Sequence, residues 1–170
     1  MQRVAKFEKV TKKQFKEGVT NVSPIVDMTD EIIDSMYEAV EIPTRATSGS
    51  AGYDFHIPFG ITLTPGSTVT VPTGIRAKME DGWVLMIFPR SGLGFKYRLR
   101  LNNTVGVIDA DYYNSDNEGH IMVKITNESD KTFTLAKGDR FAQGVFLPFG
   151  ITEDDNADGV RNGGMSSTGK

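Results

Sequence analysis

After Pro43 the chain is a series of short runs rich in β-branched and aromatic residues, separated by turn-forming pairs such as Pro65-Gly66 and Asp81-Gly82. Gly, Pro and Asp favour turns, and the runs between them have the length and composition of strands. Strands this short bury their apolar faces only when they pair into sheets that pack on one another. We therefore predict an all-β domain, either a sandwich or a barrel. The predicted strands cover residues 52–57, 61–63, 68–71, 75–79, 83–88, 120–126, 132–135 and 140–147.

The first forty residues have a different pattern. Thr11 and Gln14 match a capping box and Gly18 suits the position after a helix, which predicts a short helix over residues 12–17, with a strand at residues 4–7 before it. A second helix should start at Thr29 or Asp30 and end before Pro43. Its apolar residues fall on one face and are Ile32, Ile33, Met36, Tyr37 and Val40. We interpret both helices as packing or oligomer-contact structure.

Composition excludes several classes of protein. The 170 residues carry a net charge of −3 and contain no block of basic residues, so we expect no nucleic acid partner. The chain has no cysteine, which excludes disulfides and thiolate metal sites. The longest apolar run, residues 83–88, is too short to span a bilayer, and the N-terminus lacks the apolar region of a secretory signal. We therefore expect a soluble, cytoplasmic protein with no membrane association.

These patterns divide the chain into three parts. Residues 1–41 form a partly helical N-terminal extension, and residues 42–150 form the β domain. Residues 151–170 are first acidic and then rich in Gly and Ser, so they should form a mobile C-terminal arm.

The stretch from Asn103 to Tyr112 is the strongest candidate for chemistry. An apolar, strand-like run ends here in Asp109, and a carboxylate at such a position is partly desolvated and suited to act as a general base. Tyr112 can offer a flat ring beside the group on which that base acts. The alternative is a β-turn with solvated aspartates and a half-buried tyrosine.

Other stretches place polar groups where a β-rich core does not need them. Asp54 could organise an arginine or a hydrated metal ion, or it could only cap a turn. Arg90 follows an apolar strand within a Gly-rich stretch that could present N–H groups and a guanidinium to phosphate, or form an ordinary turn. Gln143 interrupts a strand, and a buried amide needs partners. His56 and His120 are isolated in the sequence, which favours structural roles.

Together these stretches resemble the motifs of the trimeric dUTP diphosphatases (dUTPases). The resemblance covers roughly residues 42–170, and its five motifs follow one another in the family's order. They are AGYDF (51–55), PRSGLGFK (89–96), NTVGVIDADY (103–112), GDRFAQ (138–143) and GGMSSTGK (163–170). The resemblance implies a distorted β jelly roll of the β-clip type. It also implies a homotrimer with three active sites at subunit interfaces, each closed by a C-terminal arm.

The same resemblance implies hydrolysis of dUTP to dUMP and pyrophosphate. This reaction limits uracil incorporation into DNA and supplies dUMP for dTMP synthesis. Asp109 would be the general base for water attack on the α-phosphorus, and Gln143 would help to position that water. Mg²⁺ would be held by substrate phosphates and water, with Asp54 in its outer sphere and no direct protein ligand. The implied substrate-binding residues are Arg90, Ser91, Gly92, Asn103, Gly106, Val107, Ile108, Tyr112, Met122, Arg161, Met165, Ser166, Ser167 and Thr168.

The chain departs from the family pattern at three places. Residues 113–118 make the third motif longer than usual, Met165 and Ser166 replace the usual Phe and Gly, and Arg161 lies one residue closer to the last motif. Two alternative functions are compatible with parts of this pattern. One is dCTP deaminase, which shares the fold, but its essential Glu corresponds here to Lys124, which cannot carry that proton. The other is a dUTPase-like nucleotide-binding module that engages a protein partner.

Overall fold

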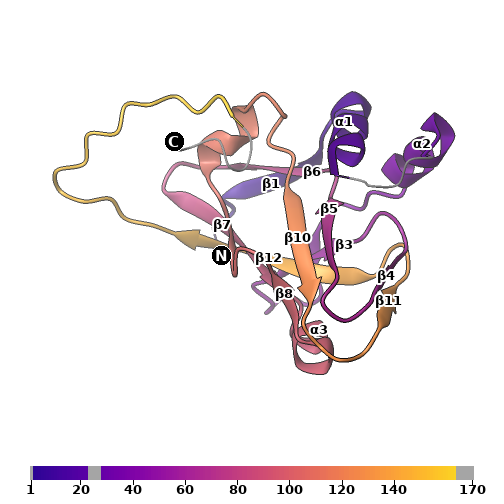
Figure 1. The fold of residues 1–170 in the computed structure, drawn as a ribbon. Coiled ribbons are helices and arrows are strands. Elements are labelled where there is room, and N and C mark those ends of the chain that lie inside the picture. The colour runs from indigo at the N-terminus through magenta and orange to yellow at the C-terminus, as the bar shows by residue number, and fades with distance from the viewer. Residues whose placement is uncertain (1, 23–27, 164–170) are drawn as a thin grey trace.

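Strands make up most of the regular structure in the computed structural model, which describes residues 2–22 and 28–163 (Figure 1). The strands are β1 (Ala5–Lys9), β2 (Thr44–Arg45), β3 (Tyr53–His56), β4 (Ile61–Leu63), β5 (Thr68–Pro72), β6 (Ile75–Met79), β7 (Trp83–Pro89), β8 (Leu99–Leu101), β9 (Gly106–Ile108), β10 (Met122–Asn127), β11 (Phe133–Leu135) and β12 (Arg140–Pro148). The helices are α1 (Lys12–Val22), α2 (Asp30–Glu38), α3 (Ser91–Tyr97) and the 3₁₀ helix η1 (Ala110–Asn114).

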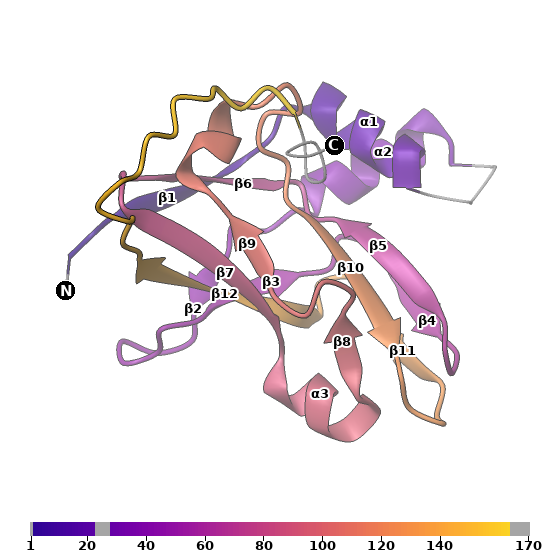
Figure 2. The ribbon, with the colours of Figure 1, turned by 60° about the vertical axis from the view of Figure 1, so that its left-hand side comes forward.

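These strands pair antiparallel into small sheets. The largest has the order β2–β3–β12–β7–β9, and a second has the order β5–β10–β8. Two pairs, β1–β6 and β11–β4, complete the pairing of the described strands (Figure 2). The predicted all-β class is confirmed, and every strand predicted from the sequence is present to within two residues.

The core lies between the sheets because the central strands bury alternate residues. In β7 the buried side chains are Leu85 and Ile87, and in β10 they are Val123 and Ile125. This period of two places one face of each strand against the core. Lys124 lies on the opposite face of β10, exposed to solvent.

The N-terminal strand is part of this β structure. β1 pairs with β6 along its whole length, from Ala5 opposite Met79 to Lys9 opposite Ile75. Phe7 of β1 is buried and lies 5.6 Å from the ring of Phe55, measured between ring centroids. The three-part division of the chain stays a prediction, but the extension contributes both a strand and core side chains.

Helix α1 is longer than the sequence predicts and has a different cap. Gly18 lies inside the helix and not after its end. A Cβ atom at this position would lie 2.7 Å from Cε1 of His120, so glycine leaves room for that ring. Thr11 Oγ1 accepts a hydrogen bond from Gln14 N at 3.2 Å, as a capping box requires. The reciprocal acceptor for Thr11 N, however, is the carboxylate of Glu118 at 2.7 Å and not Gln14.

Helix α2 follows the prediction closely. Thr29 is its N-cap, and Ile33 and Met36 are buried on the predicted apolar face. No helix was predicted for the Gly-rich segment after β7, but it forms α3, and Tyr97 at its end stacks on Phe133 with 4.4 Å between ring centroids. This tertiary contact stabilises a helix that two glycines disfavour.

Between β12 and residue 163, the last one described, the chain forms no helix or strand. Residues 151–163 leave the body as an extended loop and return to the region of η1 (Figures 1 and 2). The predicted substrate contacts at Met165, Ser166, Ser167 and Thr168 lie outside the described residues. Within the described ranges, no helix is long and apolar enough to cross a membrane.

Candidate active site

The candidate general base lies at the end of edge strand β9. Among the described residues, β9 pairs only with β7. Gly106 lies opposite Ile87 in this pair, and a Cβ atom there would make a tight contact of 3.1 Å with Cβ of Ile87. The strand ends at Ile108, and Asp109 follows in an extended conformation as the residue before η1. The sequence therefore placed Asp109 correctly at a strand end.

Asp109 is more exposed than the sequence led us to expect. Its side chain is 51% exposed, and Asp111 beside it is 58% exposed. Arg161 Nη1 donates to Asp109 Oδ2 at 2.8 Å and to Asp111 Oδ1 at 3.1 Å. Asp109 is thus about half covered in the single chain, and its side-chain hydrogen-bond partner among the described residues is Arg161.

Arg161 also covers the ring of Tyr112. The guanidinium carbon lies 5.2 Å from the ring centroid, and the Arg161 side chain is only 13% exposed. Burial opposes its charge, but the hydrogen bonds to Asp109 and Asp111 outweigh burial and raise the pKa of Arg161. Tyr112 itself is 1% exposed, and its hydroxyl donates to the backbone oxygen of His120 at 2.8 Å.

A second polar group lies around Asp54 on β3. The Asp54 side chain is 13% exposed and contacts two arginines, Arg140 Nη1 at 3.1 Å and Arg90 Nε at 3.6 Å. Of the alternatives for Asp54, the structure favours the one in which it organises arginine. Gln143 of β12 faces Asp54 across the β3–β12 pair, and its Nε2 donates to Pro89 O at 3.5 Å.

The two groups are separated along β7. Ile108, just before Asp109, faces Leu85, whereas Gln143 faces Phe88 from the other side of β7. Along β7 the two positions are three residues apart, at about 3.3 Å per residue, and across the sheet they are two strand spacings of about 4.8 Å apart. Combined at right angles, these lengths put Ile108 and Gln143 roughly 14 Å apart. Within one chain, Asp109 therefore lies beside Tyr112 and Arg161. Asp54 lies beside Arg90 and Gln143, and the two groups do not contact each other.

Two depressions accompany these groups. The first, of only about 10 Å³, lies between β9, β8 and β10 and is lined in part by Asn103, Gly106, Ile108 and Met122. Val107 points away from it and is exposed. The second, about 460 Å³, is lined by Arg90, Gly92 and Arg140 among others. Ser91 is exposed at the start of α3.

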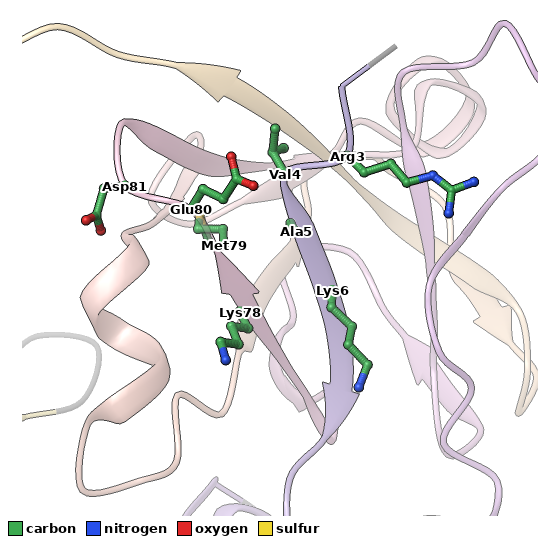
Figure 3. Close-up of a pocket in the computed structure, with 8 residues that line it drawn as sticks. All are labelled: Arg3, Val4, Ala5, Lys6, Lys78, Met79, Glu80 and Asp81. Carbon is green, nitrogen blue, oxygen red and sulfur yellow. The ribbon is translucent and has the colours of Figure 1, made fainter.

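A wider hollow of about 530 Å³ lies on β1 and β6, away from both groups. Figure 3 shows that the charged side chains at its rim, among them Arg3, Lys6 and Asp81, fan out in different directions. They do not converge on a common point, as the polar groups of a ligand site do. We do not assign a function to this hollow.

The comparisons with known proteins decide the family. Residues 38–169 match the dUTPase family model. The deoxyuridine 5'-triphosphate nucleotidohydrolase of Lactococcus lactis is 44% identical over 133 residues, which cover 76% of this chain and 89% of that protein. The chain belongs to the dUTPase family. The dUTPase of Haemophilus ducreyi is likewise 44% identical, over 137 residues covering 76% of this chain and 87% of that protein.

Solved dUTPase structures share the fold. The dUTPase of Streptococcus mutans has a TM-score of 0.63 at 38% identity and covers 86% of this chain and 98% of its own. A mutant dUTPase from phage phi11 of S. aureus, whose structure describes the coordination of a structural Mg(II) ion, has a TM-score of 0.60 at 21% identity, covering 74% of this chain and 94% of its own. At 21% identity, the phage phi11 structure supports the shared fold and nothing about the function of this chain.

Sequence reasoning missed the partners of the predicted dUTPase residues. Arg140 and Asp111 lie inside the quoted motifs, but no spacing rule indicates that they pair with Asp54 and Arg161. Asn117 lies outside the motifs, yet its Nδ2 donates to Tyr112 Oη at 2.8 Å. Only the general signal of a polar, turn-rich segment at residues 113–118 points to it.

Proposed function

We propose that this chain hydrolyses dUTP to dUMP and pyrophosphate, as the names of its relatives imply for them. The observation that carries the proposal is the position of Asp109 at the exposed end of edge strand β9, in a chain of the dUTPase family. In this role Asp109 accepts a proton from a water molecule. The water oxygen forms a bond to the α-phosphorus, and the bond from that phosphorus to the pyrophosphate oxygen breaks.

Arg161 must leave Asp109 before this base can act. In the free chain its guanidinium lies on Asp109 and over the ring of Tyr112. We propose that substrate replaces Arg161 at both places, with the deoxyribose over the ring and the water at Asp109. Arg161 then becomes available to the phosphates, for which a guanidinium is well suited.

The active site requires more than one copy of the chain. Asp109 lies one residue beyond Ile108, so the same strand spacing puts its backbone roughly 16 Å from that of Gln143, which exceeds the reach of the two side chains to one water molecule. We propose that Gln143, Arg90, Ser91 and Gly92 of one copy complete the site around Asp109 of another. A homotrimer with three such interfaces satisfies this requirement.

Uracil selection fits the edge of β9 that pairs with no other described strand. The pyrimidine's alternating donor and acceptor groups can pair with the unpaired backbone of an edge strand, and cytosine reverses part of that pattern. Asn103, Gly106 and Met122 line the narrow depression beside this edge, where a thymine methyl group lacks space. Tyr112 beneath the sugar excludes a 2′-hydroxyl.

Magnesium fits this site only as an ion carried by the substrate. Both carboxylate oxygens of Asp54 face arginines, and the described residues contain no group of three His, Cys, Asp or Glu side chains able to hold a metal. We therefore propose that triphosphate oxygens and water hold Mg²⁺, with Asp54 no closer than the outer sphere. When bound, the ion neutralises charge on the phosphates.

The test is pyrophosphate release from dUTP, dCTP, dTTP and UTP with Mg²⁺, in the wild type and in Asp109→Asn. We expect turnover of dUTP alone and its loss in the variant. Ammonia release from dCTP would support the deaminase instead. Binding of dUTP without turnover of any nucleotide would support the binding module.

A further inference from the structure

The segment 113–118 folds back onto Tyr112, which lies within the third motif. Tyr112 Oη donates to His120 O at 2.8 Å and accepts from Asn117 Nδ2 at 2.8 Å. Both partners belong to the stretch that follows Tyr112, so that stretch determines the position of the ring's hydroxyl end. Arg161, in contrast, contacts the face of the same ring.

Asn117 is itself fixed at both ends of its amide. Its Oδ1 accepts from Ser115 Oγ at 3.0 Å, while its Nδ2 donates to Tyr112. Ser115 Oγ also donates to Tyr112 O, and Ser115 is buried. The chain then reverses at Glu118 and Gly119, with φ values of 57° and 68°. The Gly119 position tolerates no side chain, because a Cβ atom would lie 2.7 Å from Tyr112 O.

The N-terminal segment holds the chain reversal at Glu118 and Gly119 through hydrogen bonds from Thr11. Glu118 accepts two hydrogen bonds from Thr11, at 2.7 Å from its N and at 2.6 Å from its Oγ1. These bonds outweigh burial and lower the pKa of Glu118. They also hold Glu118 in a left-handed conformation that a non-glycine residue rarely adopts.

Tyr113 makes a second contact between this segment and the N-terminal part of the chain. Its hydroxyl donates to Glu8 Oε2 at 2.6 Å, and the guanidinium carbon of Arg76 lies 4.4 Å from its ring centroid. The hydrogen bonds from Tyr113 and Lys6 lower the pKa of Glu8 to about 2, so the acceptor is ionised at neutral pH. Segment 113–118 is thus held between Tyr112 on one side and β1 and Thr11 on the other.

From these contacts we propose that Asn117 is a positioning residue for sugar selection, and that the N-terminal segment supports it through Glu118. The inference rests on the proposed hydrolysis of dUTP. A ring held at its hydroxyl cannot tilt away from the sugar, so a 2′-hydroxyl meets it. Loss of the Asn117 bond leaves the hydroxyl bonded to His120 O but removes one of its two restraints, so the ring can shift, which admits the ribose of UTP and loosens contact with the deoxyribose of dUTP.

The test compares kcat/KM for dUTP and UTP in Asn117→Ala, with Asn114→Ala as the matched control. Asn114 is exposed at the end of η1 in the same segment. Loss of one hydrogen bond predicts a fall of about tenfold in the dUTP/UTP ratio of Asn117→Ala, mainly through KM for dUTP, and no change in the control. A merely structural role would lower both kcat/KM values together and leave the ratio unchanged, which would overturn the proposal.

Two further variants keep the test decisive. Asn117→Asp keeps the side-chain shape but removes the donor, and its added charge acts equally on the two triphosphates, so it replaces Asn117→Ala if that variant fails to fold. Glu118→Gln cannot accept both bonds from Thr11, and an unchanged ratio there would overturn the role of the N-terminal segment. Wild-type protein that hydrolyses no nucleotide would instead refute the proposed function and this inference with it.

Discussion

Acid should destabilise this protein through His120. The ring is 1% exposed, and its Nε2 accepts a hydrogen bond from Gly74 N at 2.9 Å, so the folded state holds a neutral imidazole. Burial lowers the pKa of His120 from 6.5 to about 4, against a smaller opposite effect of Glu118. In the unfolded chain the same ring titrates near 6.5.

The sign and size of the effect follow from linkage. Between these two pKa values the unfolded state binds the extra proton, so stability is complete above about pH 6.5 and falls as the pH is lowered toward 4. A difference of 2.5 pKa units corresponds to about 3 kcal/mol when fully expressed, and to about 2 kcal/mol at pH 5.

The assay is urea unfolding at pH 7.5 and pH 5, at one protomer concentration, for the wild type and His120→Gln. Glutamine does not titrate and has an oxygen that can accept from Gly74 N. Other groups titrate in both proteins, so the difference between them isolates His120. We expect the wild type to lose about 2 kcal/mol more than the variant. An equal loss in both proteins would refute a neutral, buried His120.

Three other substitutions test separate contacts. Gly18→Ala usually stabilises a helix, but here its Cβ would meet His120, so we expect a loss of about 1–3 kcal/mol in urea unfolding; a gain would contradict the close packing. Arg161→Ala should change stability by less than about 1 kcal/mol, because both of its carboxylate partners are more than half exposed; a loss of several kcal/mol would contradict this estimate. Asp109→Asn should lower kcat for dUTP by about 10²–10⁴-fold while calorimetry still detects dUTP binding; unchanged kcat would exclude Asp109 as the base.

Local patterns predicted much of the fold. Most strands of the β domain and helix α2 were predictable because strand alternation, turn residues and an N-cap all lie within a few residues of one another, whereas the short strands β2 and β8 were missed. Asp109 and Asp54 were likewise predictable as candidates, because each lies in a short stretch whose residue types point to chemistry.

What the sequence could not predict depends on distant partners. Helix α3 contains Gly92 and Gly94, and its stacking of Tyr97 on Phe133 has no local signal. The acceptor for Thr11 N at the start of α1 is Glu118, which lies 107 residues from Thr11 in the sequence. Gly18 inside α1 packs against His120, another contact with a residue far away in the sequence. Such contacts are set by the tertiary structure, which overrides local propensity.

The separation of Asp109 from Gln143 has a genetic consequence. In the trimer proposed above, Asp109→Asn and Gln143→Ala would each inactivate every site of a pure assembly, but a mixed assembly would contain interfaces where an intact Asp109 meets an intact Gln143. With random mixing in equal amounts, about one quarter of the sites would be intact. Two defective alleles of this gene, expressed together, would therefore complement each other.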